Sequence, residues 1–228
     1  MLLQQDVVIY DCCYNERLPV INIENIIIYI SYLHREMTTH IETSRSALIT
    51  KDNFLSSKES EDLIHHIEND LVLELNPQGK IYGKVITFHR SIGFFSDEAS
   101  GYKYTGQISR AQPMSEPLKK LLEQVNDDLG TKFNSWLINK YECGDDYIGP
   151  HSDDEKELSC NMVACISLGS SRIFRCIAKD KSLKKDIQTS NGQLLLMCGD
   201  FQKEFTHQIP KTKTLVGTRI SLTARQFK

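Results

Sequence analysis

The spacing of apolar residues predicts two helices in the first half of the chain. Ser56-x-x-Glu59 forms a capping box, and apolar residues then recur at helical spacing as far as Leu71. A second apolar stripe covers residues 115–129, and Gly130 is suited to end that helix. The second half of the chain changes to short apolar runs separated by polar residues and glycines, which predicts strands. These runs are 133–141, 162–168, 173–177, 193–197 and 218–225.

Helices followed by many short strands predict an α+β fold built on a β-sandwich or a barrel. The length of 228 residues fits one domain with a peripheral extension. We therefore expect an N-terminal extension of unknown role over 1–50 and a single domain over 51–228. The longest apolar run, 26–33, is far shorter than the roughly 20 residues that span a bilayer.

Composition narrows the class of protein only a little. The chain is 40% hydrophobic and 25% charged, which is ordinary for a soluble globular protein. A net charge of −3 argues against binding nucleic acid by bulk electrostatics, although a local basic face stays open. Seven cysteines without a C-x-x-C pair indicate neither a disulfide framework nor a zinc knuckle. We expect reduced thiols in an intracellular protein, in the nucleus or the cytoplasm.

The segment His151-Ser152-Asp153 is the first candidate for chemistry. In an extended segment, residues two apart project to one side, so an imidazole and a carboxylate can meet at one point. His207, beyond the strand predicted at 193–197, is the best candidate for a third ligand. Two imidazoles and one carboxylate hold a ferrous ion and leave positions for a co-substrate and dioxygen. H-x-D also occurs by chance, so this motif alone favours an ordinary surface or core histidine.

The last predicted strand strengthens the case for a metal site. Its polar residues alternate with apolar ones and share one face, a pattern that a surface strand also shows. Two arginines on that face, soon after His207, suit a buried anionic ligand. A guanidinium binds a carboxylate through two hydrogen bonds and stays charged when desolvated. The polar residues are Arg219, Ser221, Thr223 and Arg225.

Ordered motifs along the chain resemble the AlkB-type nucleic-acid dioxygenases. The match extends from about Asn53 to the C-terminus. It implies a double-stranded β-helix, or jelly-roll, over about 133–228, with flanking helices and a nucleotide-recognition lid over about 79–110. The motifs are Asn139-x-Tyr141, His151-x-Asp153-x-Glu155, Ser167-Leu168-Gly169-x-x-Arg172-x-Phe174, His207-x-x-Pro210 and Arg219-x-Ser221-Leu222-Thr223-x-Arg225.

The resemblance implies a cofactor and its co-substrates. Fe(II) would be held by His151, Asp153 and His207, with 2-oxoglutarate and dioxygen as co-substrates. Arg219 would pair with the far carboxylate of 2-oxoglutarate. Ser221 departs from the family pattern, in which Asn is common, but no ligand and no arginine is lost. The other implied co-substrate residues are Asn139, Tyr141, Ser221, Thr223 and Arg225.

The resemblance also implies an activity, the oxidative removal of alkyl groups from nucleic-acid bases. Hydroxylation of a methyl carbon on a ring nitrogen releases formaldehyde and restores the base. The expected substrates are 1-methyladenine and 3-methylcytosine in DNA, RNA or both. We expect a monomer that does not bind a membrane. Two other classes stay open, namely a hydroxylase of a protein or small molecule and a binding module without catalysis.

A base must leave its stack to reach a metal inside such a fold, so a pocket and strand-holding residues are needed. The resemblance places substrate contacts in the lid and in the acidic residues after the metal motif. A carboxylate there favours a cationic alkylated ring, although a solvated acidic turn has the same sequence. The lid tyrosines can stack on bases or simply pack the sheet. The expected residues are Tyr82, Arg90, Tyr102, Tyr104, Asp154 and Glu155.

Overall fold

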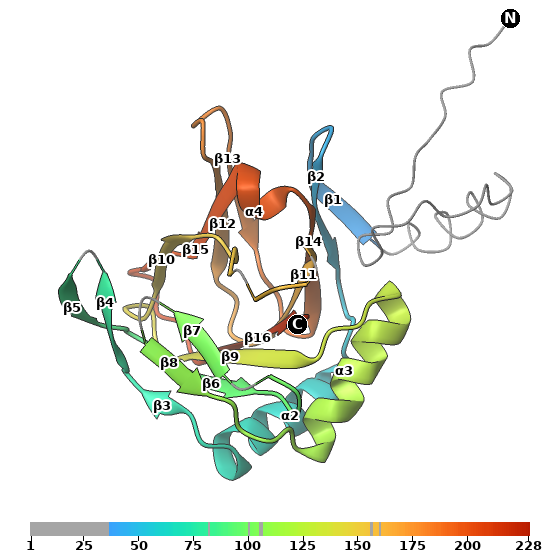
Figure 1. The fold of residues 1–228 in the computed structure, drawn as a ribbon, viewed down its shortest axis with the longest axis vertical. Helices are drawn as coiled ribbons and strands as arrows, with labels where there is room; N and C mark the ends of the chain where they lie inside the picture. The colour runs from blue at the N-terminus through green and yellow to red at the C-terminus, as the bar shows by residue number, and fades with distance from the viewer. Residues whose placement is uncertain (1–36, 82, 100, 105–106, 156, 160) are drawn as a thin grey trace, which may run out of the picture.

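An antiparallel sheet of eight strands forms the centre of the fold, with the order β1-β2-β14-β11-β16-β9-β6-β3 (Figure 1). The computed structural model describes residues 37–228 apart from 82, 100, 105–106, 156 and 160. Strands from both ends of the described chain therefore meet in one sheet. They are Met37–Glu42 (β1), Ser46–Lys51 (β2), Glu74–Leu75 (β3), Ser91–Phe95 (β6), Ser135–Tyr141 (β9), Val163–Gly169 (β11), Gln193–Gly199 (β14) and Arg219–Arg225 (β16).

A second antiparallel sheet of four strands faces the first, in the order β10-β15-β12-β13. Alternate residues of the strands point into the space between the two sheets, where apolar side chains from both sheets form one core. This arrangement is the jelly-roll sandwich of the predicted α+β fold. The strands are Ile148–His151 (β10), Ile173–Ala178 (β12), Lys184–Gln188 (β13) and Phe205–Ile209 (β15).

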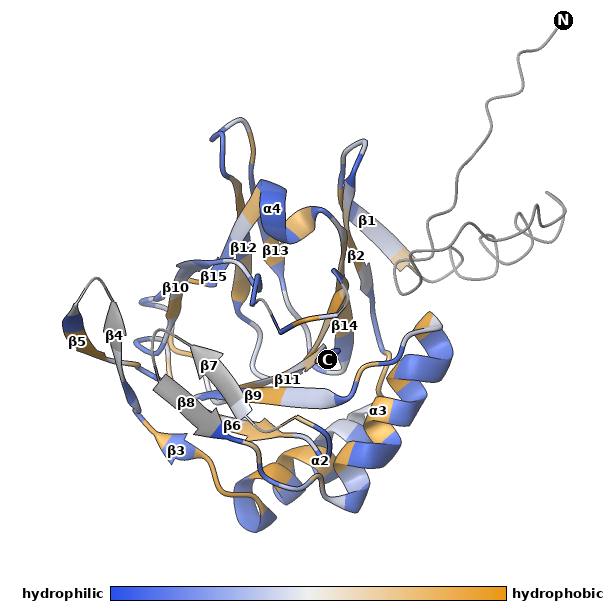
Figure 2. Cartoon of the chain, in the orientation of Figure 1, coloured by the Kyte–Doolittle hydropathy of each residue, from blue (hydrophilic) through white to orange (hydrophobic). Residues whose placement is uncertain are grey.

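Two helices, α2 (Ser57–Asp70) and α3 (Glu116–Leu129), cover the other face of the eight-stranded sheet. The predicted capping box begins α2, with Ser56 and Glu59 each bonded to the other's backbone. Gly130 ends α3 in the left-handed conformation, with φ of 63°. The apolar side of both helices faces the sheet (Figure 2). A further helix, α4 (Phe201–Glu204), is a single turn between β14 and β15.

The strand β16 lies between β11 and β9 and is buried on both faces. Ile220, Leu222 and Ala224 pack in the core beneath the helices. Arg219 and the other polar residues of the strand face the small sheet, and all of them are buried. The alternation in the sequence therefore marks a central strand with two buried faces, and the surface strand that the pattern also allowed is excluded.

Two hairpins occupy the segment in which a lid was expected. They are formed by β4 (Gln78–Ile81) with β5 (Lys84–Thr87), and by β7 (Gly101–Tyr104) with β8 (Gln107–Arg110). The strand β8 lies beside β4 and β6. Tyr82 lies outside the described residues, as do the side chains of Tyr102 and Tyr104 in β7. Their predicted substrate contacts stay predictions.

The N-terminal boundary that we expected at residues 50 and 51 falls inside the large sheet. Strand β1 pairs with β2, and β2 pairs with β14 along its whole length. Residues 37–50 thus belong to the sheet, whereas 1–36 lie outside the described residues. The local pattern hides this pairing because the partner strand lies far along the chain. Within the described ranges, no helix is long and apolar enough to cross a membrane.

Candidate metal centre and anion pocket

Three side chains suited to binding a metal meet at one end of the space between the sheets. His151 ends β10, and His207 lies directly opposite it in β15. Asp153 follows two residues after His151. The candidate ligand atoms of the three residues all lie within 4.8 Å of one another. His151 Nε2 is 3.9 Å from Asp153 Oδ1, and His207 Nε2 is 3.8 Å from Asp153 Oδ2. The structure therefore brings the predicted ligand set together.

The surroundings of the two imidazoles favour their neutral, metal-binding form. His151 Nδ1 lies 2.9 Å from the carbonyl oxygen of Gly149, so this nitrogen donates and Nε2 keeps its lone pair. The ring of His207 stacks on Phe174, with ring centres 5.2 Å apart. Burial lowers the pKa of His151, although Asp153 opposes the shift. Burial, together with the nearby His151, lowers the pKa of His207 to about 3. Metal binding requires such deprotonated nitrogens.

The carboxylate of Asp153 is buried, with 4% of the residue exposed. Arg225 Nη2 donates to its Oδ1 at 2.5 Å. Burial is the largest influence and opposes ionisation, but Arg225 and, less strongly, His207 and His151 together hold the pKa of Asp153 below its usual value. One carboxylate and two neutral imidazoles form a donor set that suits Fe(II).

The other end of the cavity holds the guanidinium of Arg219, which is 1% exposed. Its Nη2 donates to Ser167 Oγ at 2.9 Å, whereas its Nε and Nη1 have no hydrogen-bond partner among the described residues. The guanidinium lies 5.5 Å from the centre of the Tyr141 ring. Buried donors without acceptors are costly. This end of the cavity therefore suits an anion that can accept two hydrogen bonds.

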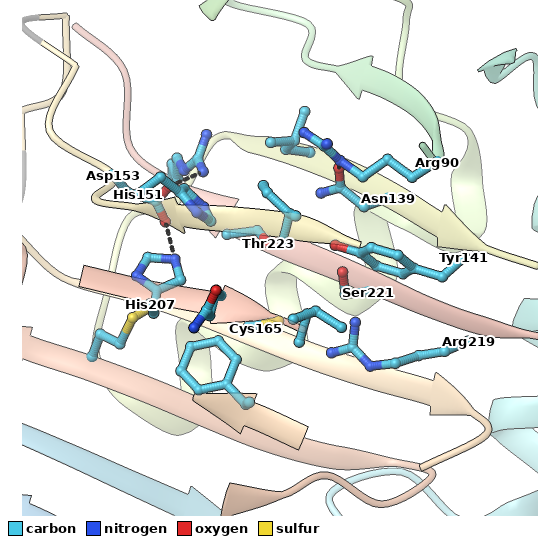
Figure 3. A pocket seen from close by; sticks show the side chains of 17 residues that line it. Arg90, Asn139, Tyr141, His151, Asp153, Cys165, His207, Arg219, Ser221 and Thr223 are labelled. Carbon is cyan, nitrogen blue, oxygen red and sulfur yellow. Dashed lines mark hydrogen bonds and ion pairs between the residues drawn. The ribbon is translucent and has the colours of Figure 1, made fainter. Parts of the chain in front are cut away.

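The floor between the two ends is formed by the adjacent strands β9, β16 and β11. His151, Asp153 and His207 lie at one end of this floor, and Arg219 and Tyr141 lie at the other (Figure 3). A small molecule that carries an anionic group at its far end can reach from the metal ligands to the guanidinium. The floor residues are Asn139, Tyr141, Cys165, Arg219, Ser221, Thr223 and Arg225.

Arg90, which we predicted as a substrate contact of the lid, lies inside the same cavity. It is 4% exposed, and its Nε donates to Asn139 Oδ1 at 2.7 Å. Its guanidinium lies 5.1 Å from the centre of the Phe88 ring. Arg90 lies directly before β6 and belongs to neither hairpin. The sequence did not indicate this position. From there it can contact either the co-substrate or the substrate.

The two acidic residues after Asp153 have different surroundings. Neither residue lines the cavity itself, and Asp154 is exposed. Glu155 is partly buried, with 13% of its side chain exposed, and its Oε1 lies 3.4 Å from Arg225 Nη1. One arginine therefore connects Glu155 to the metal ligand Asp153. Of the two predicted substrate contacts, only Glu155 is held next to the site.

The sequence assigned no role to two buried residues beside the site, Arg172 and Gln202. Arg172 donates to the backbone oxygens of Cys143, Asp146 and Pro210, at 2.9, 2.8 and 2.8 Å. It thereby ties the turn before β10 to the loop after β15. Arg172 stands in one of the motifs above, but the motif assigned it no role. Gln202 lies in the one-turn helix α4, which is too short to leave a periodic pattern.

A family model described as the 2OG-Fe(II) oxygenase superfamily matches residues 47–225. The chain belongs to this superfamily. Its class of dioxygenase uses Fe(II) as cofactor, with 2-oxoglutarate and dioxygen as co-substrates. The residues of this structure fit that set, since the donors of the metal end suit Fe(II) and the buried Arg219 suits a carboxylate.

Curated relatives match only part of this chain. The DNA oxidative demethylase ALKBH2 of Bos taurus is 29% identical over 157 residues, which are 65% of this chain and 56% of the relative. The alpha-ketoglutarate-dependent dioxygenase alkB homolog 3 of Bos taurus is 31% identical over 135 residues, 54% of this chain and 47% of the relative. The chain thus spans about half the length of these relatives. The solved structure of OsALKBH1 is similar to this one, with a TM-score of 0.55 at 16% sequence identity. The match covers 82% of this chain and 100% of that chain, and it supports the fold alone.

Proposed function

We propose that this protein is an oxidative demethylase of nucleic-acid bases that acts on 1-methyladenine and 3-methylcytosine. One observation carries the proposal: a single cavity joins the His151, Asp153 and His207 group to a buried Arg219, whose Nε and Nη1 lack acceptors among the described residues. The relatives named as DNA oxidative demethylases support a nucleic acid as the class of substrate.

In this proposal, His151, Asp153 and His207 would hold Fe(II), and Arg225 fixes the carboxylate of Asp153 through an ion pair that favours its ionised form. When bound, the iron with 2-oxoglutarate and dioxygen supplies the oxidation of an N-methyl group, which leaves as formaldehyde. The chain's own part is to hold neutral imidazoles at the site and to keep bulk water away from it. Phe174, stacked on His207, helps to exclude that water.

The anion end would bind the far carboxylate of 2-oxoglutarate. Arg219 offers two buried donors, and Tyr141 lies against the same guanidinium. A charge-assisted pair of hydrogen bonds in a buried site is strong and fixes the orientation of the ligand. The keto-acid end would then face the metal ligands along the floor. The residues that we assign to this floor are Asn139, Ser221, Thr223 and Arg225.

The substrate would approach from the side of Glu155 and the hairpins. A ring methylated at adenine N1 or cytosine N3 carries a positive charge, which a nearby carboxylate favours. Glu155 is held beside the metal end by Arg225. We assign the flipped base to this region, with Arg90 as a further contact and with Tyr82, Tyr102 and Tyr104 of the lid as stacking or hydrogen-bonding partners.

The test adds Fe(II) and 2-oxoglutarate anaerobically, then oxygen and an oligonucleotide that contains 1-methyladenine. We expect unmodified adenine, detected by mass spectrometry, to depend on iron and 2-oxoglutarate and to disappear in Asp153→Ala. Single- and double-stranded, deoxy and ribo substrates would then be ranked. Succinate formed only with a peptide or a small molecule, with no formaldehyde from the oligonucleotide, would instead identify a hydroxylase of that other class.

A matched pair of variants tests the role of Glu155. Glu155→Gln removes the carboxylate beside the metal end, whereas Asp154→Asn removes the exposed carboxylate next to it in sequence. We expect kcat/KM for 1-methyladenine to fall about tenfold in Glu155→Gln, equal to about 1.4 kcal/mol, and to stay near wild type in Asp154→Asn. Equal effects in the two variants would contradict a specific role for Glu155.

A further inference from the structure

The segment that carries Asp153 has no strand pairing of its own. Strand β10 ends at His151, and residues 152–155 are irregular. A metal ligand in such a segment depends on neighbouring groups for its direction. Arg225 holds the carboxylate of Asp153, but a carboxylate is only as well placed as the backbone that bears it.

A side chain of α4 holds that backbone. The N–H of Asp153 donates to Gln202 Oε1 at 2.9 Å, and both residues are buried. Gln202 Nε2 in turn donates to the sulfur of Met197 at 3.4 Å, so both ends of the amide are engaged. The neighbouring Ser152 Oγ donates to the carbonyl oxygen of Phe205 at 2.9 Å. The loop of Asp153 is therefore attached to α4 and to the start of β15.

The helix α4 is in turn attached to the N-terminal hairpin. The carboxylate of Glu204, the last residue of α4, accepts hydrogen bonds from two side chains in the turn between β1 and β2 and from the first residue of β2. Chain connections and hydrogen bonds thus run from this turn through α4 to the backbone of Asp153. The three donors are Thr43 Oγ1 at 2.9 Å, Ser46 Oγ at 2.5 Å and Arg45 Nη2 at 2.7 Å.

We propose that Gln202 is a positioning residue of the metal centre, and that the β1–β2 turn holds it in place through Glu204. The inference rests on the proposed role of Asp153 and His207 as Fe(II) ligands. Helix α4 leads directly into β15, which carries His207. The hydrogen bond from Asp153 to Gln202 therefore fixes two ligands from separate segments relative to each other. Without it, the N–H of Asp153 loses its buried acceptor and the loop can move.

The test compares Gln202→Met with Lys203→Ala. Methionine has a similar length but removes the Oε1 acceptor, whereas Lys203 is an exposed neighbour on α4 that pairs with Asp200. Co(II) serves as the probe in an anaerobic titration of the metal-free protein, followed by visible absorption. We expect Gln202→Met to bind Co(II) about 10- to 100-fold more weakly, with an altered absorption spectrum. Lys203→Ala should bind as the wild type does.

Hydrogen exchange of the metal-free proteins gives a second readout. The peptide that contains Asp153 should exchange faster in Gln202→Met and regain its protection in Gln202→Glu, which restores an acceptor. Unchanged Co(II) affinity and unchanged exchange in Gln202→Met would overturn the proposal. If that variant does not fold, Gln202→Asn, which keeps the amide but shortens its reach, is measured in the same way, and wild-type values there would overturn it.

The failure of the proposed function gives a different result. If the wild type binds Co(II) no better than Asp153→Ala, then the ligand assignment fails and the role of Gln202 fails with it. If the wild type binds Co(II) and Gln202→Met binds it more weakly, then the role of Gln202 is supported whether or not a methylated base is repaired.

Discussion

The two ends of the cavity are built in different ways. At the anion end, Arg219, Tyr141 and Ser167 stand on neighbouring strands of the large sheet, so the ladder of backbone hydrogen bonds fixes their positions. At the metal end, the two histidines face each other in the small sheet, but Asp153 lies on a loop and depends on Arg225 and Gln202. A ladder of many bonds tolerates the loss of one side chain. The metal end should therefore be the easier one to damage by a single substitution.

The largest effect should come from Asp153→Ala, which breaks the metal end. The variant removes a proposed ligand and a buried acceptor of Arg225. We expect metal binding and turnover to fall below detection, and the free energy of unfolding of the metal-free protein to fall by about 3–5 kcal/mol. Metal titration and urea unfolding measure the two effects. Unchanged unfolding would mean that Arg225 does not depend on Asp153.

The next effect, from Arg219→Met, should be confined to the anion end. Removing the buried guanidinium should weaken 2-oxoglutarate binding roughly 100-fold, or about 2.7 kcal/mol, while Co(II) affinity without 2-oxoglutarate stays at the wild-type value. Calorimetry with each ligand measures both. Arg175→Met is the matched control, because Arg175 lies in the small sheet and pairs with Asp186 at the surface. A loss of Co(II) affinity in Arg219→Met would show that the two ends are not independent.

A smaller effect is expected for Arg172→Lys. A lysine cannot donate to all the backbone oxygens that Arg172 reaches, so the turn before β10 loosens from the loop after β15. We expect a loss of about 1–3 kcal/mol in the free energy of unfolding and several-fold weaker metal binding. Urea unfolding and Co(II) titration are compared with Arg175→Lys. If 2-oxoglutarate binding weakens while metal binding does not, the support that we assign to Arg172 is wrong.

The smallest effect should come from Thr223→Val, on the floor between the two ends. The hydroxyl is lost while the shape of the side chain is nearly kept. We expect KM for 2-oxoglutarate to rise by less than about tenfold, because one neutral hydrogen bond contributes about 1 kcal/mol. Metal affinity should stay unchanged. Steady-state succinate formation measures the first, and a rise far above tenfold would make Thr223 a principal co-substrate contact.

The sequence predicted the parts of the fold that depend on neighbouring residues. The capping box at Ser56 and the end of α3 at Gly130 lie where local pattern placed them. The alternation in β16 brought its arginines onto one face, and H-x-D brought two candidate ligands together. The helices and the alternation in β16 follow from periods of 3.6 and of two residues, which a single segment contains. Asp153, in contrast, lies on the irregular loop after β10 and owes its direction to contacts with distant residues.

The parts that the sequence did not reveal depend on long-range pairing. Strands β1 and β2 belong to the large sheet only because β14 lies beside them. Gln202 touches Asp153 across a gap in sequence that no periodicity links. Arg90 was predicted as a substrate contact of the lid. Its place in the cavity depends on a hydrogen bond to Asn139, which lies far away in the sequence. Tertiary contacts of this kind decide the support of the site but leave no local pattern.

The position of β16 has a consequence for how the protein folds during its synthesis on the ribosome. Translation delivers β9 and β11 well before β16, yet β16 separates them in the finished sheet. Until residues 219–225 emerge, both strands present an unpaired edge to the nascent chain and to its surroundings. The middle of the sheet therefore closes last, and the protein acquires its catalytic interior only when that strand is threaded between its two neighbours.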